Sequence, residues 1–428
     1  MLKINWKWIY PGLKIKRWVI VISIGVMMLV SGTMCLSFGL LADPLIDKAT
    51  TMQGFLFKLS AALISVGFIS VITGVICLVK SVEALYLKRN PASRRGLVEL
   101  AYEERGLSQG PKIIAFGGGT GLFNLLSGLK KYTRQITAVT TVADDGGSSG
   151  RLRTDMDIPP PGDIRNCLVA LAESESLMEN IMQYRFEDSE FSGHCFGNLL
   201  LAVLSKVKGS FADGVHEAHN ILSVRGRVVP VVPRKLTLEA VHPDGTKTTG
   251  QDAISKCTKE ISRIKLNPPP GDVSDEIKTL IREADIIVYG PGSLFTSVIP
   301  NIIVNGMEEA LHSSRAIKIY VCNTMTQAGE TSGFSVEDHV NALERHSSNK
   351  IIDMVLINNG PITEDHLKIY RNSGSDPVSE GSIANLEARG YSILHADVVN
   401  DSHYIHHHPD KLSRALMEIY RNENAKKS

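Results

Sequence analysis

The segment Lys-Ile-Ile-Ala-Phe-Gly-Gly-Gly-Thr-Gly-Leu, residues 112–122, decides the fold. A short apolar run at 112–116 is typical of a strand buried on both faces, and the segment 123–131 behind the glycines has a helical pattern. Glycines let a ligand approach the backbone, and the N–H groups at a helix start favour phosphate. A tight strand–helix turn without a ligand is the alternative. The candidate ligand-binding residues here are Gly118, Gly119, Thr120 and Gly121.

This loop matches neither of two common phosphate-binding motifs. Leu122 takes the last place of a G-x-G-x-x-G pattern, and no Lys-Ser/Thr pair follows to make a P-loop. The evidence for phosphate binding here is therefore the order of predicted strand, glycines and predicted helix, and not a match to a known motif.

The same order of apolar run and helical pattern repeats outward along the chain. It predicts an α/β fold with a mostly parallel sheet and crossover helices. A turn at Pro-Asp-Gly-Thr, 243–246, predicts a hairpin of 238–242 with 247–249, as an antiparallel insertion or edge. The expected strands are 112–116, 136–142, 228–232, 286–289, 317–322 and 351–357, and the expected helices are 164–172, 198–207, 274–284, 304–311 and 336–345.

A second polar loop follows the strand predicted at 136–142. Its carboxylates are suited to sugar hydroxyls, base N–H groups or a divalent ion, and its arginines to phosphate. A solvated acidic turn is the alternative. The candidate binding residues are Asp144, Asp145, Ser148, Ser149 and Arg151.

Two further loops open predicted helices. In the segment 159–166, Asp163 is placed to cap the helix that follows, and this role alone would explain it. Arg165 and Asn166, in the first turn, are candidate binding residues together with Asp163. In the segment 193–198, Asn198 is a candidate, whereas a lone histidine such as His194 is more often structural.

Two loops in the second half of the chain have the same character. Both follow predicted strands, and ligands of open parallel sheets sit outside the carboxyl ends of the strands. Because several polar loops lie at such ends, we expect them to form one crevice. The candidate residues here are Gly290, Gly292, Ser293, Asn323 and Thr326.

Two long apolar runs, 18–41 and 59–79, precede this part of the chain and carry no charge. Each is long enough as a helix to cross the roughly 30 Å hydrocarbon core. A cleaved signal peptide, a buried hairpin and a single span are the alternatives. The basic flanks predict that both termini lie in the cytosol under the positive-inside rule, and we expect a two-span protein of a bacterial cell membrane. These basic residues are Lys3, Lys7, Lys14, Lys16 and Arg17 before the first run and Lys80, Lys88, Arg89, Arg94 and Arg95 after the second.

The predicted organisation is a two-span anchor at 1–81, a juxtamembrane linker at 82–110 and an α/β domain at 111–428. The net charge of +1 over 428 residues gives no field for nucleic acid, so the expected ligand is small. Six cysteines without a C-x-x-C pair argue against a zinc cluster or a disulfide framework.

These motifs resemble the gluconeogenesis-factor (YvcK-like) family, within the 2-phospho-L-lactate transferase (CofD-like) superfamily. The resemblance covers about residues 112–411. It implies a Rossmann-like sheet, and it implies UDP-N-acetylglucosamine as ligand, with Tyr370 as a uracil or ribose neighbour. Two departures are Phe295, where the family has tyrosine, and His406, where the family commonly has arginine in Arg-His-Asp. The resulting triple histidine, 406–408, is a poor metal site because consecutive residues rarely converge on one ion.

The resemblance favours a binding regulator without a catalytic residue, a required cofactor or a resident metal. The ligand diphosphate would lie on 118–121 and 290–293, with Asp144, Asp145 and Asn198 on sugar or base. Occupancy would bias an interaction with an amino-sugar biosynthetic enzyme, and so affect cell-envelope precursor supply and cell shape. The alternatives are a Mg²⁺-dependent phospholactyl-type transferase with Asp144 or Asp145 on the metal, and a scaffold with a vestigial crevice. A homo-oligomer is possible.

Overall fold

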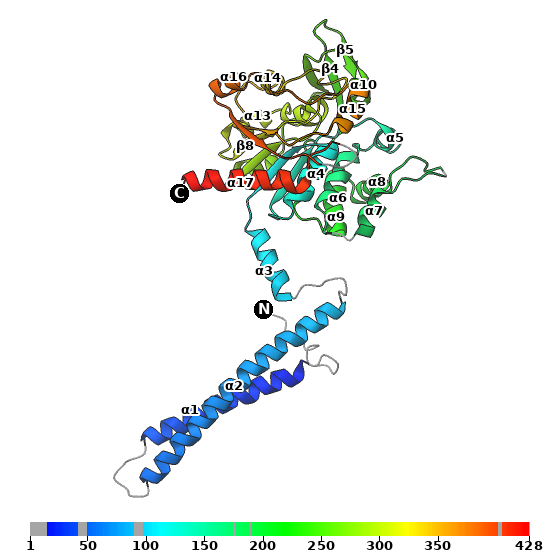
Figure 1. The fold of residues 1–428 in the computed structure, drawn as a ribbon. Helices are drawn as coiled ribbons and strands as arrows, with labels where there is room; N and C mark the ends of the chain where they lie inside the picture. The colour runs from blue at the N-terminus through cyan, green and yellow to red at the C-terminus, as the bar shows by residue number, and fades with distance from the viewer. Residues whose placement is uncertain are drawn as a thin grey trace. The chain divides into compact units, whose positions relative to one another are not determined.

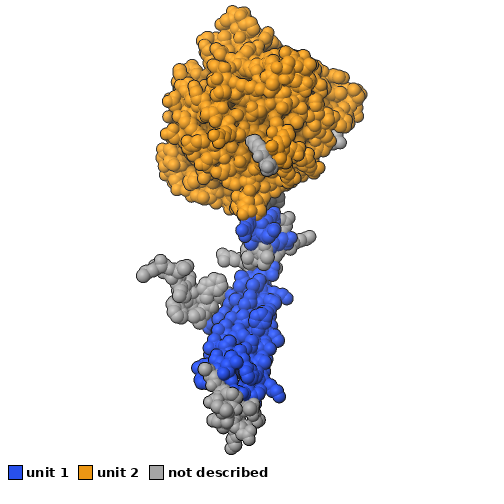
Figure 2. Space-filling view, turned by 90° about the vertical axis from the view of Figure 1, so that its left-hand side faces the viewer, with its two compact units in different colours: residues 1–105 blue, residues 106–428 orange. Residues whose placement is uncertain are grey.

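The computed structural model describes residues 15–41, 49–89, 97–173, 176–188, 190–400 and 405–427. The chain divides into two compact units, Met1–Arg105 and Gly106–Ser428, which Figure 2 colours separately. The division falls inside the segment 82–110 that the sequence predicts to be a linker. The basic residues before residue 15 and the loop at 42–48, on which the predicted orientation depends, lie outside the described residues.

The first unit is an antiparallel pair of long apolar helices, α1 (Lys16–Leu41) and α2 (Ala49–Arg89). Glycines allow close approach: a Cβ on Gly67 would lie 2.8 Å from the carbonyl oxygen of Gly25. The indole Nε1 of Trp18 donates a hydrogen bond of 3.0 Å to Ser81 Oγ at the open end of the hairpin. Segments of both helices, Lys16–Leu40 and Met52–Ala84, are long and apolar enough to cross a membrane.

The second unit is built on a seven-stranded parallel sheet in the order β10-β9-β8-β7-β1-β2-β3. From β1 the chain builds outward through β2 to β3, then returns to the other side of β1 with β7 and continues to β10. The order of the strands therefore reverses between β1 and β7. The strands are β1 (Ile113–Gly117), β2 (Ile136–Thr140), β3 (Arg227–Pro230), β7 (Ile286–Tyr289), β8 (Ile317–Val321), β9 (Met354–Asn358) and β10 (Ser392–Ala396).

Helices cover both faces of this sheet (Figure 1), which explains why its central strands are continuously apolar. One face packs on α4 (Gly119–Leu129), α6 (Gly162–Leu171), α8 (Phe196–Lys208), α9 (Phe211–Leu222) and α17 (Pro409–Lys427). The other packs on α11 (Asp275–Glu283), the π-helix η2 (Leu294–Val298), α12 (Ile299–Ile302), α13 (Met307–Ser313), α14 (Val336–Arg345) and α16 (Ile383–Ala388). The remaining helices are α3 (Leu97–Ser108), α5 (Gly147–Asp155), α7 (Ser176–Gln183), α10 (Gln251–Lys256) and α15 (Glu364–Asn372).

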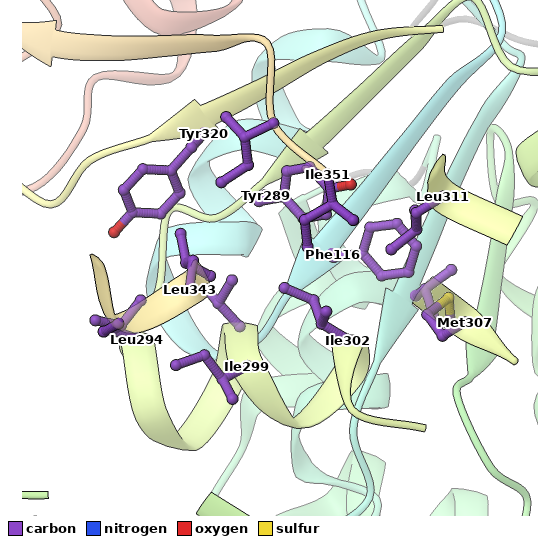
Figure 3. Close-up of a cluster of buried hydrophobic side chains, with 14 of the residues drawn as sticks. Phe116, Tyr289, Leu294, Ile299, Ile302, Met307, Leu311, Tyr320, Leu343 and Ile351 are labelled. Carbon is purple, nitrogen blue, oxygen red and sulfur yellow. The ribbon is translucent and has the colours of Figure 1, made fainter. Parts of the chain in front are cut away.

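The hydrophobic core on the second of these faces lies beneath the ends of β1 and β7 (Figure 3). The rings of Phe116 and Tyr289, on these neighbouring strands, stack with centroids 5.7 Å apart. Leu294 and Ile299 from the helices after β7 belong to the same cluster. The ends of the two strands are therefore held by aromatic packing at the point where their loops begin.

A second, three-stranded antiparallel sheet has the order β5-β4-β6. Its strands are β4 (Thr237–Val241), β5 (Lys247–Thr249) and β6 (Arg263–Asn267). Buried residues alternate with partly buried ones in β4 and with exposed ones in β6, as a sheet with one covered face requires. Leu238, Ala240 and Ile264 join the same core cluster as Phe116.

The predicted α/β class, the mostly parallel sheet and its six strands are confirmed. The predicted hairpin is confirmed, and of the two expected placements it is the antiparallel insertion: it belongs to this separate sheet and not to an edge of the main one. The helix expected at 304–311 begins at Met307, because Gly306 has φ +75 and opens it. The elements that the sequence analysis did not identify are α5, α7, α9, α10, β6, η2, α12, α15, α16, β10 and α17.

The β3 edge of the main sheet is closed to further strand pairing. On its outer side the N–H of Val228 donates to Nε2 of His219 at 2.8 Å, and Pro230 has no N–H to offer. Burial lowers the pKa of His219 to about 4, so the ring stays a neutral acceptor at neutral pH. A peptide therefore cannot extend the sheet at this edge.

Docking of the C-terminal helix can be tested at Gly128. A Cβ there would lie 2.1 Å from both Pro409 O and Ser413 Oγ of α17, so Gly128→Ala must displace that helix. We expect a loss of about 2 kcal/mol or more of unfolding free energy, typical of overpacking, measured by thermal unfolding of the full chain in detergent. Gly106→Ala, in α3 with open space around the added methyl, is the matched control and should cost nothing. Equal unfolding midpoints for both variants would contradict the assigned packing.

Candidate functional site

The glycine loop after β1 packs so closely against its neighbours that a side chain would not fit at two of its positions. A Cβ on Gly118 would lie 2.6 Å from Oδ2 of Asp163, and one on Gly121 would lie 2.6 Å from the carbonyl oxygen of Pro291. Gly119 has φ +60, a conformation that favours glycine. These positions let the loop lie directly against both α6 and the loop that follows β7.

The first turn of α4 carries backbone donors that the helix itself cannot satisfy. The N–H of Gly119 donates to Oδ1 of Asp163 at 2.9 Å. The N–H groups of Thr120 and Gly121 belong to the same turn, and both residues line the cleft described below. One donor of the predicted phosphate loop is thus occupied by a protein carboxylate, and the next two remain for a ligand.

The loops after β7 and β8 are fastened to each other. The side chain of Asn323 accepts from the N–H of Gly292 at 3.3 Å and donates to its carbonyl at 2.9 Å. Nε2 of Gln327 donates to Ser293 Oγ at 2.9 Å. Gly290, with φ +79, turns the chain at the end of β7. Asn323 therefore shapes the loop, and the predicted Gly290, Gly292 and Ser293 stand together with it.

These loops enclose a cleft of about 520 Å³ beside the point where the strand order reverses between β1 and β7. In open α/β sheets this is the position at which ligands bind. The expected convergence of separate polar loops is therefore observed for those after β1, β7 and β8. Of the predicted residues, the cleft is lined by Gly118, Gly119, Thr120, Gly121, Gly292, Ser293, Asn323, Thr326 and Tyr370.

Two of these residues also have structural roles. The buried hydroxyl of Thr326 accepts from the N–H of Asp376 at 2.9 Å. The hydroxyl of Tyr370 accepts from the N–H of Ile405 at 2.9 Å, which ties α15 to the segment that precedes the histidines. Both side chains therefore fix walls of the cleft in addition to lining it.

Three predicted residues that do not line the cleft, Ser148, Arg165 and Asn198, form a separate polar network. Nδ2 of Asn198 donates to Ser148 Oγ at 3.2 Å, and its Oδ1 accepts from Arg165 at 3.2 Å. Ser148 Oγ also lies 3.3 Å from Nδ1 of His194 and accepts from the N–H of Cys195 at 3.2 Å. The network is buried, includes His194, and pins the start of α8 to α5.

The other predicted residues of these loops also have hydrogen-bond partners within the protein. Asp145 accepts from the N–H of Asp252 at 2.9 Å and so caps α10, whereas Asp144 accepts from the N–H of Gly146 at 3.0 Å. Arg151 donates to the carbonyl of Ser192 at 2.9 Å. Two further predicted residues join the buried network: Asn166 Oδ1 accepts from Arg165 at 2.6 Å, and Ser149 Oγ accepts from Asn198 Nδ2 at 3.5 Å.

Asp163 stands between the cleft and this network. Burial, and then the negative charge of Asp144, raises the pKa of Asp163 to about 6, and the hydrogen bond from Gly119 opposes that rise. The carboxyl is therefore close to its titration point in mildly acidic conditions. The charge of the Asp163 carboxyl therefore affects the electrostatic potential at Gly118 and Gly119, which it contacts.

The cleft itself carries little fixed charge. Among its described lining residues there is no lysine, arginine, aspartate or glutamate, and the titratable side chains are Tyr370, His406 and His407. Burial lowers the pKa of His407 to about 4, and its Nε2 is buried without a hydrogen-bond partner. Burial also lowers the pKa of His406. At neutral pH the cleft presents backbone N–H groups, hydroxyls, amides and neutral imidazoles.

Sequence reasoning missed one buried acid that braces the site. Glu330 Oε1 accepts from Thr296 Oγ1 at 3.0 Å and from Ser255 Oγ at 3.1 Å, which joins the β8 loop to η2 and α10. Burial raises the pKa of Glu330. Since Asp145 caps the other end of α10, the small sheet and its helix support three loops around the site. No local pattern marks Glu330, because its partners are distant in sequence.

The raised pKa of Asp163 has a consequence for stability. Between pH 4 and 6 the unfolded chain ionises this carboxyl and the folded chain does not, so the stability falls as pH rises through this window, by up to about 3 kcal/mol. We expect Asp163→Asn, which keeps an acceptor for Gly119, to remove this loss and be more stable than the wild type at pH 7. Denaturant unfolding at pH 4 and 7 measures it, with the exposed Asp188→Asn as control. A wild-type pH dependence retained in Asp163→Asn would refute the assignment.

Comparison with known proteins agrees with this architecture. The family model described as 2-phospho-L-lactate transferase CofD matches residues 113–399. A crystal structure of a UPF0052 family protein from Bacillus halodurans aligns with a TM-score of 0.70 and 45% identity, covering 72% of this chain and 99% of that one.

Relatives that match about three quarters of this chain and relatives that match nearly all of it are both described as gluconeogenesis factors. The gluconeogenesis factor of Bacillus subtilis is 41% identical over 315 residues, 73% of this chain and 99% of its own. A Clostridium acetobutylicum protein described as a "putative gluconeogenesis factor" is 40% identical over 420 residues, which are 96% of this chain and 91% of its own. Its similarity therefore extends into the apolar helices. The chain belongs to the family of 2-phospho-L-lactate transferase CofD and, within it, to the gluconeogenesis factors.

Proposed function

We propose that this gluconeogenesis-factor relative is a membrane-anchored regulator that binds a nucleotide sugar, with UDP-N-acetylglucosamine as the ligand to test. The cleft at the strand-order reversal carries the proposal, because its polar groups are those that a diphosphate and a sugar require. The N–H groups of Thr120 and Gly121 at the start of α4 suit the diphosphate. The Tyr370 ring and His406 at the far wall suit the nucleoside or the sugar.

The regulatory part of the proposal rests on how the loops around the cleft are held. Among the described residues, the titratable side chains that line the cleft are one tyrosine and two histidines. Occupancy would order the loops that Asn323, Gln327 and Glu330 hold together. We propose that this ordering biases contact with an amino-sugar biosynthetic enzyme, and so links the protein to cell-envelope precursor supply and cell shape.

The ligand can be tested with a pair of variants at Thr120. This exposed residue lies in the first turn of α4, where a carboxylate favours the helix by about 0.3–1 kcal/mol. Thr120→Asp should therefore keep or raise stability while it repels a diphosphate, with affinity falling about tenfold or more, or ~1.4 kcal/mol. Calorimetry with UDP-N-acetylglucosamine measures it, and the uncharged Thr120→Asn is the control. Absence of binding by the wild type at millimolar ligand would refute the proposed ligand.

The second candidate is a Mg²⁺-dependent phospholactyl-type transferase, favoured by the CofD match and by the acid pair. Asp163 and Asp144 interact electrostatically at the edge of the glycine loop. Mg²⁺ is commonly held by one or two carboxylates together with substrate phosphates, and these two acids fit that role. Among the described residues no group of three or more His, Cys, Asp or Glu is placed to hold a metal ion. Substrate phosphates would have to complete the coordination.

Turnover separates the two candidates. Incubation of the full chain with Mg²⁺ and candidate nucleotides, followed by mass spectrometry, should show bound ligand returned unchanged if the protein is a regulator. Product formed by the wild type and lost in Asp144→Asn would favour the transferase.

We also propose that α1 and α2 span the membrane, with both chain ends cytoplasmic. Large apolar side chains such as Ile20, Met27, Phe68 and Ile69 are exposed on the helix pair, whereas core helices of soluble proteins are mostly buried. A signal sequence would explain α1 but not α2. We expect the full chain to stay in the pellet after alkaline carbonate extraction, and a chain lacking 1–89 to be soluble. A reporter inserted at 42–48 should respond as periplasmic or extracellular; a cytoplasmic response would refute the topology.

A further inference from the structure

One cysteine of the second unit lies beside a histidine in the small sheet, outside the cleft. Three of the four cysteines in this unit are buried, and the fourth, Cys257 at the end of α10, is partly exposed. Its Sγ lies 3.9 Å from Nε2 of His242, the residue directly after β4. A thiol beside an imidazole is the arrangement in which cysteine acts as a nucleophile, because the imidazole can remove the thiol proton.

The imidazole of His242 is oriented so that a lone pair faces the thiol. Its Nδ1 lies 2.8 Å from the carbonyl oxygen of Glu260, which can only accept a hydrogen bond. Nδ1 therefore carries the proton of the neutral ring, and Nε2 is the acceptor. A nucleophile, a base and a third group that orients the base are the three parts of an activated nucleophile, and all three are present here.

A hydroxyl group connects the two side chains. Oγ1 of Thr248, in β5, lies 2.8 Å from Nε2 of His242 and 3.7 Å from Sγ of Cys257. When this hydroxyl donates to Nε2, its oxygen can accept from the thiol. The thiol proton can therefore reach the imidazole either directly or through the hydroxyl, which passes on its own proton as it receives another.

We propose that Cys257 is a site of oxidation by hydrogen peroxide, with His242 as the base that activates it. The thiolate attacks one peroxide oxygen, so that an S–O bond forms, the O–O bond breaks, sulfur is oxidised and the peroxide is reduced. The hydroxide that leaves takes up the proton held by His242. The thiol and hydrogen peroxide thus give a sulfenic acid and water, and small thiols can reduce the sulfenic acid again.

The surroundings of the thiol favour a small uncharged oxidant over a bulky charged disulfide. Cys257 is only partly exposed, and once the proton has moved, the hydroxyl and the imidazole beside its sulfur can donate hydrogen bonds to the leaving oxygen. The lysines that flank it in sequence are already paired, Lys256 with Asp252 at 2.6 Å and Lys259 with Asp244 at 2.9 Å. They therefore offer little attraction to an anionic reagent.

Oxidation here would act on the cleft through α10. A Cβ on Gly329 would lie 2.5 Å from the carbonyl oxygen of Ser255 and 2.8 Å from that of Cys257, so the loop after β8 packs on the end of this helix. Glu330, in the same loop, accepts from Ser255 Oγ at 3.1 Å, and Gln327 lines the cleft. An added oxygen enlarges the side chain of a residue in this contact, so we expect the loop to loosen.

The first test measures how fast Cys257 reacts. The full chain in detergent is treated with hydrogen peroxide at pH 7, sulfenic acid is trapped with dimedone, and the labelled peptides are quantified by mass spectrometry. We expect Cys257 to react about tenfold or more faster than free cysteine, since a positioned base contributes at least this much. A rate no greater than that of free cysteine would overturn the proposal, and this measurement needs no variant.

A pair of histidine variants separates the base from a structural role. His242→Gln has a donor for the Glu260 carbonyl and an acceptor for Thr248, but it cannot take up the thiol proton. We expect its melting temperature to be unchanged and its Cys257 to react as slowly as free cysteine. His216→Gln, at an exposed histidine of α9, is the control and should keep the wild-type rate. Equal rates in the wild type and His242→Gln would rule out the imidazole as the base.

The last test asks whether oxidation reaches the loop after β8, and it does not depend on the ligand of the cleft. Amide hydrogen exchange is measured over 323–331 before and after peroxide treatment, with Cys257→Ala treated in the same way as control. We expect faster exchange in the oxidised wild type and no change in Cys257→Ala. Unchanged exchange in a wild type whose Cys257 is fully oxidised would disprove the connection to the cleft.

Discussion

The site depends on the absence of side chains at Gly118 and Gly121. With hydrogen at these positions, the loop after β1 lies in contact with Asp163 on one side and with the Pro291 backbone on the other. A methyl group at either would come within 2.6 Å of an oxygen atom. The loops of β1 and β7 can therefore meet, and α4 begins where its first N–H groups face the cleft.

The surrounding structure keeps these loops in place from a distance. Asp145 and Glu330 both attach to α10, and α10 packs on the small sheet whose apolar face joins the main core. The small sheet is thus a support for three loops rather than a separate binding module. This explains why two acids in or near the polar loops turn toward the protein instead of the cleft.

Strong local patterns in the sequence were sufficient for much of the fold. Continuous apolar runs followed by glycines identified β1, β7 and their loops, and the carboxyl-end rule brought these loops together correctly. The strand β10 escaped because its residues are mostly half-exposed, so Ser392–Ala396 lacks a continuous apolar run. The helix α7 was missed because it has only eight residues, which is too short a window for helical periodicity to stand out.

The sequence could not predict which of the candidate site residues line the cleft and which are hydrogen-bonded elsewhere in the protein. Asp144 and Asp145 are adjacent, yet one binds its own loop and the other caps a helix more than 100 residues away. Ser148 and Asn198 are attractive ligands for a sugar, but each satisfies the other. Such hydrogen bonds depend on how distant segments pack together, and residue spacing in the sequence does not predict them.

The shortage of fixed charge in the cleft has a consequence for how a bound anion would behave. Backbone dipoles act only over a few ångströms, so a ligand is held without long-range electrostatic steering. Encounter rates then vary little with ionic strength, and dissociation is not slowed by desolvated ion pairs. The nucleotide sugar proposed as ligand would therefore exchange readily with solution, and occupancy of the cleft would follow its concentration in a graded manner.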